Sequence, residues 1–206
     1  MIIAFEGPEG GGKGTQLRLL EKFLKESGYE VIVVREPGGT MAGEIIRNML
    51  LNLENITLSP LTETLLFFAA RSQLISEIIE PAVKRKKVVL MDRSFWSTLA
   101  YQGYARGIRL TVLKTLARLV VGRFTPDLVI LLDLPVEAGL SRKHGQNEVN
   151  RLEAEDIEFH RKVRNGYLKL CKEEKGFWVK IDATNTIPQI QKAIQTAVTQ
   201  KLEQHK

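Results

Sequence analysis

Short apolar runs recur along the chain and lack a strict alternation of apolar and polar side chains. They are rich in Val, Ile and Leu, a composition typical of strands that are buried on both faces in a parallel sheet. Four such runs and one expected edge strand are Ile2–Phe5, Val31–Val34, Val88–Met91, Leu128–Leu132 and, at the edge, Trp178–Ile181.

Longer amphipathic stretches lie between these runs and carry apolar residues at helical spacing. The predicted helices are Thr15–Ser27, Gly43–Leu51, Leu61–Ile79 and Ile187–Glu203, and Pro81 is expected to end the third of them. Because strands and helices alternate, we expect right-handed crossover connections. The prediction is an α/β three-layer sandwich, with a five-stranded parallel sheet flanked by helices, in a single domain over residues 1–206.

Composition and charge narrow the classes of function. The chain has 206 residues and a net charge of +6, which suits either a nucleic acid or a small anionic ligand. The basic residues are scattered, and the one tight run, Lys84–Lys87, precedes a strand and is typical of a solvated turn. We therefore expect no nucleic-acid partner. The single cysteine, Cys171, excludes an intrachain disulfide.

Membrane association is not expected. The apolar stretch at the N-terminus is too short for a signal peptide, and no segment approaches the roughly 20 apolar residues of a membrane span. The sequence therefore predicts a cytoplasmic protein.

A glycine-rich segment between the first strand and the first helix matches the G-x-x-x-x-G-K core of the Walker A loop. Glycines allow the backbone to wrap a polyphosphate, and the helix N-terminus adds its own N–H groups. Lys13 would reach the β- and γ-phosphates of a nucleoside triphosphate such as ATP. The candidate residues for this site are Gly7, Pro8, Glu9, Gly10, Gly11, Gly12, Lys13, Gly14 and Thr15.

One position departs from the motif. Gly14 stands where the pattern has a Ser or Thr whose hydroxyl binds Mg²⁺, and Thr15 follows one residue late. Either water replaces that hydroxyl, since Mg²⁺ usually retains several waters, or Thr15 takes part in binding a phosphate. The sequence leaves both alternatives open.

A carboxylate and a guanidinium follow the third strand. Asp92 is placed to hold Mg²⁺ or its waters, and Arg93 can bind a phosphate with a fork of donors. The alternative for Arg93 is a surface ion pair with Asp92. Ligands of α/β proteins bind at the carboxyl ends of central strands, which favours the binding role.

An aromatic ring and a guanidinium lie one helical turn apart at Phe67 and Arg71. The ring could stack on a base while the guanidinium meets a base carbonyl. The alternative for Phe67 is an ordinary core residue. The pairing with Arg71 favours a pyrimidine site.

Four segments in this order closely resemble bacterial thymidylate kinases: the phosphate loop, Arg35–Thr40, Phe67–Arg71 and Asp92–Gly103. The resemblance runs from Met1 to about Ile181. It implies the P-loop kinase fold, phosphorylation of dTMP to dTDP with ATP and Mg²⁺, and a homodimer formed through helices such as Leu61–Ile79.

The resemblance also implies roles for individual residues. Phe67 would stack on thymine, Arg71 would bond its exocyclic oxygen, and Arg47 and Arg93 would hold the 5′-phosphate of the acceptor. Glu9 would contact the 3′-hydroxyl of the sugar. The remaining substrate residues are Glu36, near the acceptor phosphate and the metal waters, and Ser97, Thr98, Tyr101 and Gln102, around thymine and sugar.

Some thymidylate kinases carry an arginine inside the phosphate loop, where this chain has Gly10. In the others the basic residues come from a lid, for which the candidate here is the segment 141–151. We expect Arg142 and Arg151, together with Lys13 and Arg93, to stabilise the transferring phosphoryl group. The alternative for this segment is a solvated turn between helices.

Two rival functions remain at this point, beside the alternative of a kinase homologue that has lost efficiency, which Gly14 and the few charges of the lid segment suggest. Lys-Gly-Thr after the loop glycines is also found in adenylate kinases, so another nucleoside monophosphate kinase is one rival. The other is a P-loop ATPase or regulatory binding protein, for which Phe67 and Arg71 would have no role.

Overall fold

The computed structural model describes residues 1–52, 57–143, 150–174 and 176–204 of the chain. Within these residues five strands form one parallel sheet in the order β2-β3-β1-β4-β5, so β5 is an edge strand as expected. The strands are β1 (Ile2–Glu6), β2 (Val31–Arg35), β3 (Val88–Asp92), β4 (Leu128–Asp133) and β5 (Trp178–Asp182).

Each strand ends one residue later than its apolar run. The strands are longer because the ladder hydrogen bonds continue for one residue after the core side chains stop. This additional residue is charged in every case. The charged strand ends are Glu6, Arg35, Asp92, Asp133 and Asp182. Since all the strands are parallel, these side chains lie along one edge of the sheet, where ligands of α/β folds bind.

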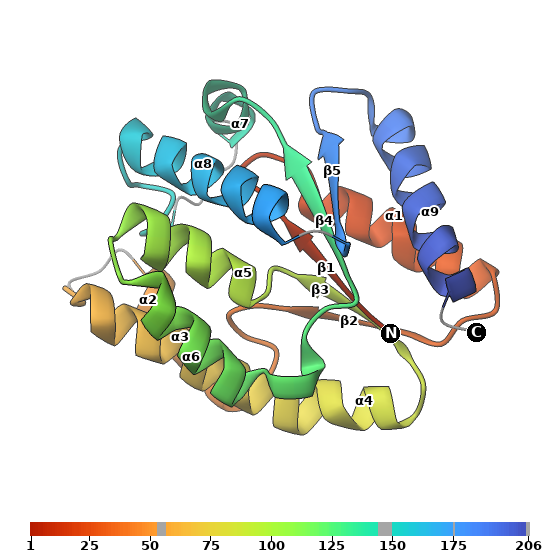
Figure 1. Cartoon of the computed structure of the whole chain (residues 1–206), viewed down its shortest axis with the longest axis horizontal. Coiled ribbons are helices and arrows are strands. Elements are labelled where there is room, and N and C mark those ends of the chain that lie inside the picture. Colours follow the sequence, from red (N-terminus) through yellow and green to blue (C-terminus); the bar gives the residue numbers. More distant parts are fainter. Residues whose placement is uncertain (53–56, 144–149, 175, 205–206) are drawn as a thin grey trace.

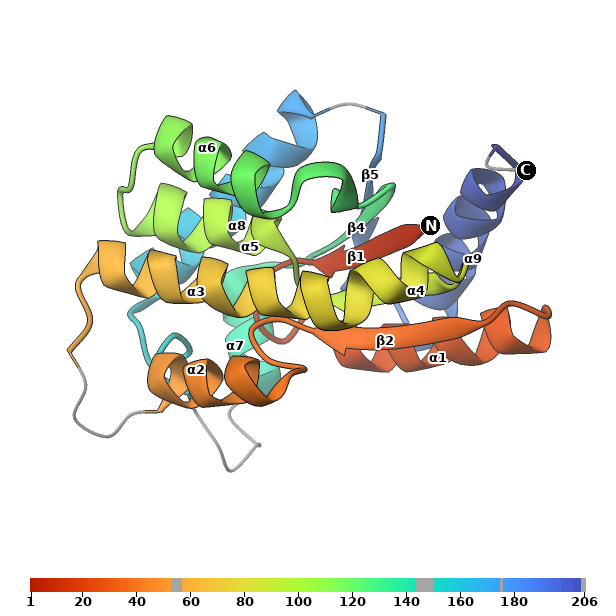
Figure 2. The same cartoon turned by 90° about the horizontal axis from the view of Figure 1, so that it is seen from below.

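Helices cover both faces of the sheet, which confirms the three-layer α/β sandwich (Figure 1). α1 and α9 lie together on one face, and α2, α3 and α6 lie side by side in the other layer (Figure 2). The helical elements are α1 (Lys13–Glu26), α2 (Met41–Leu51), α3 (Pro60–Leu74), η1 (Ile75–Ile79), α4 (Glu80–Lys84), α5 (Phe95–Thr98), η2 (Leu99–Ala105), α6 (Leu110–Val120), η3 (Gly122–Phe124), α7 (Val136–Lys143), α8 (Ile157–Glu173) and α9 (Ile187–Gln204).

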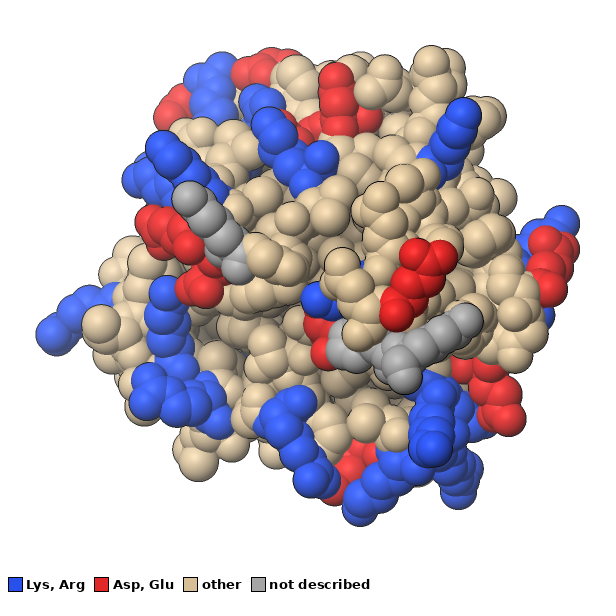
Figure 3. All heavy atoms as spheres, turned by 45° about the vertical axis from the view of Figure 1, so that its right-hand side comes forward, with Lys and Arg blue, Asp and Glu red and all other residues tan. Residues whose placement is uncertain are grey.

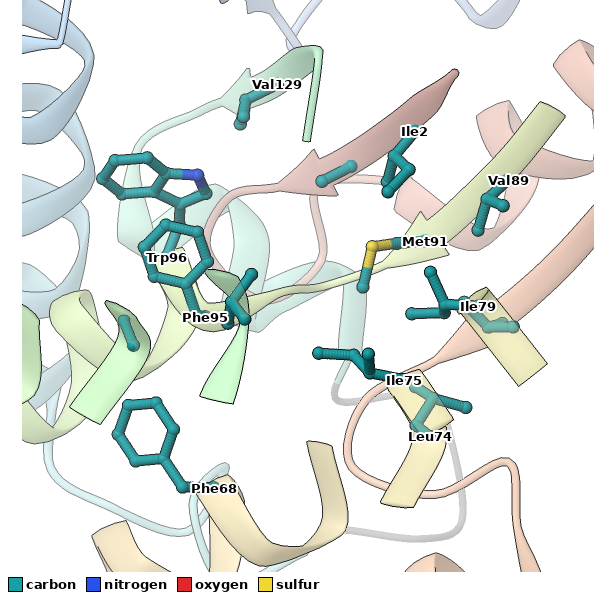
Figure 4. Packing of buried hydrophobic residues seen from close by; sticks show 14 of the residues in the cluster. Ile2, Phe68, Leu74, Ile75, Ile79, Val89, Met91, Phe95, Trp96 and Val129 are labelled. Carbon is teal, nitrogen blue, oxygen red and sulfur yellow. The ribbon is translucent and has the colours of Figure 1, made fainter. Parts of the chain in front are cut away.

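The core follows from the period-two geometry of the strands. Ile3 and Phe5 of β1 point toward α1 and α9, whereas Ile2 and Ala4 point toward α3 and its neighbours. On that second face Phe95 and Trp96 pack against the sheet beside Ile75 and other residues of η1 (Figure 4). β1 is buried along its whole length, which explains its uninterrupted apolar run.

The expectation that Pro81 ends the third helix is wrong. The helix continues through the π-helical segment η1 into α4, and Pro81 lies in the first turn of α4. Proline is tolerated there because its missing N–H removes no hydrogen bond of the following α-helix.

Among the described residues no helix is long and apolar enough to cross a membrane. On the face shown in Figure 3, basic side chains lie mostly around the periphery with acidic ones among them. They do not gather into one patch there.

Candidate active site

The phosphate loop occupies residues 7–12, between the end of β1 and the start of α1. Gly12 is the N-cap of α1 and has a left-handed backbone, φ 79°, which glycine adopts without steric cost. The Nζ of Lys13 is buried and donates to the carbonyls of Gly7, at 3.1 Å, and Pro8, at 2.9 Å. Burial, reinforced by the nearby charge of Arg93, lowers the pKa of Lys13 to about 8.

The loop lies backbone to backbone against α7. A Cβ on Gly10 would stand 2.0 Å from the carbonyl oxygen of Gly139, and a Cβ on Gly139 would stand 2.2 Å from the carbonyl oxygen of Glu9. Neither position accepts a side chain without movement of the backbone. An arginine at position 10 of this chain would therefore require the loop or α7 to shift.

A cleft of about 430 Å³ opens over the phosphate loop, within the size range of small-molecule sites. Arg142, which the sequence places in the lid, lies in α7 and donates to the carbonyl of Ala183, at 3.0 Å, and to that of Gly10. The cleft is lined by Glu9, Gly10, Gly12, Lys13, Gly14, Thr15, Arg18, Asp92, Arg93 and Arg142. We refer to it as the donor cleft.

A second cleft, the acceptor cleft, lies beside the first. Its wall contains ten of the residues expected around the acceptor: Glu9, Glu36, Arg47, Phe67, Arg71, Arg93, Ser97, Thr98, Tyr101 and Gln102. Asp92 lies there too. The residues predicted from the sequence come from five separate segments, and the fold places their side chains around one cavity.

Arg71 is held rigidly in the acceptor cleft. Its guanidinium forms an ion pair with Glu36 at 2.6 Å and donates to the Thr98 hydroxyl at 3.1 Å, and both charged side chains are almost fully buried. Glu36 follows β2 and is joined to Pro37 by a cis peptide bond. Burial raises the pKa of Glu36 above its ordinary value, although the charge of Arg71 opposes this shift.

The two clefts share three lining residues: Glu9, Asp92 and Arg93. Arg93 has a left-handed backbone, φ 69°, which is unusual for a side-chain-bearing residue and is found at functional sites. Its guanidinium pairs with Glu9, not with Asp92, so the alternative of a simple ion pair with Asp92 is wrong. Arg93 also donates to the hydroxyl of Tyr167, at 3.1 Å.

A buried carboxylate that the sequence analysis missed lies behind the residues shared by the two clefts. Glu6 is fully buried and accepts hydrogen bonds from Ser94, through both N–H and hydroxyl at 2.8 Å, from Ser97 at 2.6 Å and from Tyr167 at 2.9 Å. The available signal was a lone acidic residue that ends a buried strand. Tyr167 lies 161 residues away along the chain, and no local pattern connects it to Glu6.

The expected lid segment is only partly described. Residues 141–143 belong to α7 rather than to a loop, and 144–149 lie outside the described residues. Arg151 forms an ion pair with the buried Glu63 and donates to the carbonyl of Leu50, and it is not among the residues that line the donor cleft. Gln102 also donates to Glu63, at 2.8 Å.

Comparisons with known proteins agree with this geometry. A family model described as thymidylate kinase matches residues 5–194. The chain belongs to the thymidylate kinase family. It is 41% identical over 202 residues to a thymidylate kinase of Caldanaerobacter subterraneus, covering 98% of this chain and 96% of that one. With a thymidylate kinase of Geotalea daltonii the identity is 44% over 209 residues, covering 98% and 97%.

A solved thymidylate kinase structure, from Ehrlichia chaffeensis, superposes with a TM-score of 0.80 at 32% identity and covers 97% of this chain and 98% of the other. The P-loop kinase fold is thereby confirmed. The enzyme is a nucleoside monophosphate kinase that phosphorylates dTMP to dTDP with ATP and Mg²⁺. Membership of this family excludes both rivals, an adenylate kinase and a P-loop regulatory protein.

The residues present fit a Mg²⁺ ion that enters with ATP. The described part of the chain contains no cluster of three or more His, Cys, Asp or Glu side chains that could bind a metal ion alone. Mg²⁺ bound to a triphosphate needs only one or two protein carboxylates and otherwise keeps its waters. Asp92 lines both clefts and can provide one such carboxylate.

Proposed function

We propose that ATP binds in the donor cleft, that dTMP binds in the acceptor cleft, and that the phosphoryl group is transferred at the junction of the two. The supporting observation is that Glu9, Asp92 and Arg93 line both clefts. Two anionic substrates, one in each cleft, would meet there, with carboxylates and a guanidinium already in place.

The chemistry requires alignment more than proton transfer. The attacking atom is an oxygen of the dTMP phosphate, which is already ionised at neutral pH, so no general base is needed. Lys13, Arg93 and Arg142 lie around the donor cleft and would neutralise the charge that develops between the two substrates. Mg²⁺, held by the phosphates and Asp92, would supply further positive charge.

In the acceptor cleft, Phe67 would stack on thymine and Arg71 would donate to its carbonyl oxygen. The buried ion pair with Glu36 supports this role of Arg71, because it fixes the orientation of the guanidinium before the substrate arrives. Glu36 then acts on the acceptor through Arg71. Arg47, which donates to the carbonyl of Pro37 at 2.7 Å, would hold the 5′-phosphate together with Arg93.

The other lining residues would complete the site. Tyr101 donates to Glu9 at 2.8 Å, and this contact would orient Glu9 toward the sugar hydroxyl. Ser97, Thr98 and Gln102 would line thymine and sugar. For Arg151 the contacts in this structure favour a structural ion pair with Glu63, and its catalytic role stays a prediction.

Two variants test the assignment of the clefts. Arg47→Ala should raise the KM for dTMP more than tenfold and leave the dissociation constant of ATP unchanged. Lys13→Met should weaken ATP binding by at least tenfold and leave dTMP binding, measured by calorimetry, within twofold. Lys192→Ala, which removes an exposed charge on α9, is the control and should change neither.

The assignment would be overturned if Arg47→Ala weakened only the binding of ATP, or if Lys13→Met weakened only the binding of dTMP. A selective effect of each variant on its own substrate would support it. The acceptor series dTMP, dUMP, AMP and CMP, measured by ADP release, independently tests which base the acceptor cleft selects.

We also propose that the enzyme works in the cytoplasm as a homodimer, as the family resemblance implies. Large apolar side chains support the dimer, because they remain exposed on three helices that lie side by side (Figure 2). Met41 and Ile45 of α2 are 86% and 60% exposed, and Leu119 of α6 is 81% exposed. Leu61 and Leu65 of α3 are exposed as well. A second copy packed on these helices would cover this surface.

A further inference from the structure

Arg18 reaches into the donor cleft from α1 and has no role in the arrangement described so far. It lies four residues after Gly14, so both positions face the same side of the helix. A Cβ on Gly14 would stand 3.9 Å from the Nη1 of Arg18. The guanidinium therefore lies over the position where the Walker motif has a hydroxyl-bearing side chain.

The cations around the donor cleft differ in what they contact. Lys13 donates to carbonyls of the phosphate loop, Arg93 pairs with Glu9, and Arg142 donates to two backbone carbonyls. Arg18, in contrast, forms no hydrogen bond or ion pair with any of the described residues. Among the described residues, a polyphosphate in this cleft would compete with no carboxylate or carbonyl for the guanidinium of Arg18.

We propose that Arg18 binds the polyphosphate of the donor nucleotide, over the open space that Gly14 leaves. This inference rests on the proposed location of ATP in the donor cleft. A guanidinium is a strong partner for phosphate oxygens, since it can offer two parallel N–H donors. The chain thus exchanges a hydroxyl that would act through the metal for a cation that acts on the phosphates directly.

Gly14 contributes to this arrangement through its missing side chain. A Cβ at position 14 would already stand at van der Waals distance from the guanidinium, so a Ser or Thr would occupy part of the space beside it. Such a side chain would crowd Arg18 on its path to the phosphates. The two positions should therefore be energetically coupled.

Calorimetric titration with ATP, without acceptor, tests the proposal directly. Arg18→Ala should weaken ATP binding at least fivefold in the presence of Mg²⁺. The loss should be larger in excess EDTA, because protein cations then neutralise the phosphates alone. Arg18→Lys keeps the charge and should recover part of the affinity. Arg18 is exposed, so the melting temperature of each variant should stay within a few degrees of the parent.

The matched control is Lys22→Ala, one turn further along the same face of α1. Lys22 is exposed, pairs with Glu26 and does not line the cleft. The loss of its charge can affect ATP only through long-range electrostatics, so ATP binding should change less than twofold. A double-mutant cycle of Arg18→Ala with Gly14→Ser should be non-additive, with Arg18 contributing less to ATP binding in the Gly14→Ser background than in the parent.

The outcomes separate the two hypotheses. Unchanged ATP binding in Arg18→Ala, together with weakened binding in Lys13→Met, would overturn the role of Arg18 and leave the donor cleft assigned. Unchanged binding in both variants would overturn the donor cleft itself. Equal losses in Arg18→Ala and Lys22→Ala would also overturn the proposal, because they would show a general effect of charge.

Discussion

At the scale of single residues, the protonation state of Lys13 should limit ATP binding at alkaline pH. Because the pKa of Lys13 in the free enzyme is about 8, the Lys13 side chain is neutral in half of the enzyme molecules at that pH. A bound triphosphate favours the charged form, so ATP binding should take up protons above pH 8. The affinity should fall by about fivefold between pH 8 and pH 9, as the protonated fraction declines.

Titrations of ATP in buffers of different ionisation enthalpy measure this proton uptake. Lys13→Met should abolish it at pH 8.5, whereas Lys22→Ala should not affect it. An affinity that stays constant from pH 7 to pH 9 would contradict the lowered pKa.

Glu6 should act as a positioning residue for Arg93. It binds Ser94 and Ser97, on either side of the Phe95–Trp96 pair, and also Tyr167, which itself accepts from Arg93. Glu6→Gln replaces one acceptor by an N–H₂ group facing hydroxyl donors. We expect kcat to fall more than tenfold and the free energy of unfolding to fall by about 2 kcal/mol.

A purely structural Glu6 would lower stability and leave the kcat of the folded fraction unchanged. Tyr167→Phe, which removes a single partner of Glu6, should show a smaller effect in the same direction on both quantities. Steady-state kinetics and urea unfolding of the two variants distinguish these cases.

The sequence predicted which residues line the two clefts better than it predicted the ion pairs that these residues form. Strand ends and helix faces follow simple periodicities, which located Arg71 and Arg93, whereas Arg142 came from the resemblance to thymidylate kinases. The sequence could not show that Arg93 pairs with Glu9 or that Arg151 pairs with Glu63, since these contacts join segments 84 and 88 residues apart. Only the tertiary fold decides between such competing ion pairs.

At the scale of elements, the position of the phosphate loop should depend on the glycine of α7. Gly139→Ala would normally favour a helix by about 1 kcal/mol. Here the new Cβ would meet the carbonyl of Glu9 at 2.2 Å, so either the loop or the helix must shift. We expect a lower melting temperature and ATP binding weakened at least fivefold.

Ser141→Ala, at an exposed position of the same helix, is the control for helix propensity, so it should raise the melting temperature slightly and leave ATP binding unchanged. Unaltered ATP binding in Gly139→Ala would show that the loop does not depend on this contact. Thermal unfolding measures the melting temperature of both variants, and calorimetry measures their binding of ATP.

Element types were predictable where the apolar pattern was long and regular. All five strands and the four expected helices are present, with boundaries shifted by a few residues. The strands extend one residue further because a charged side chain at the sheet edge still permits ladder hydrogen bonds. The π-helical turn at η1 lets the helix pass through Pro81, and periodicity does not reveal a change in helical pitch.

At the scale of the whole molecule, the exposed apolar side chains of α2, α3 and α6 should lie in the homodimer interface. Leu119→Glu places a charge on a side chain that is 81% exposed in the single chain. Burying that charge without a partner is unfavourable, so the dimer should weaken at least tenfold. Sedimentation velocity over a range of concentrations measures the effect.

Leu19→Glu is the control, since Leu19 is an exposed leucine of α1 on the opposite side of the sheet. It should leave the sedimentation behaviour unchanged. A parent enzyme that sediments as a monomer at all concentrations would contradict the dimer outright. A monomeric Leu119→Glu variant with normal melting would support the proposed interface.

The contact between Gly10 and Gly139 constrains which substitutions the phosphate loop of this chain accepts. Because both glycines lie within the space that a side chain would need, a loop arginine cannot arise by one substitution in this chain. A side chain at residue 10 would require the loop or α7 to move, and Arg142, which lies on α7 and lines the donor cleft, would move with that helix. The side chain at position 10 and the placement of Arg142 are therefore linked in this chain, so that a change at the first position is expected to alter the second.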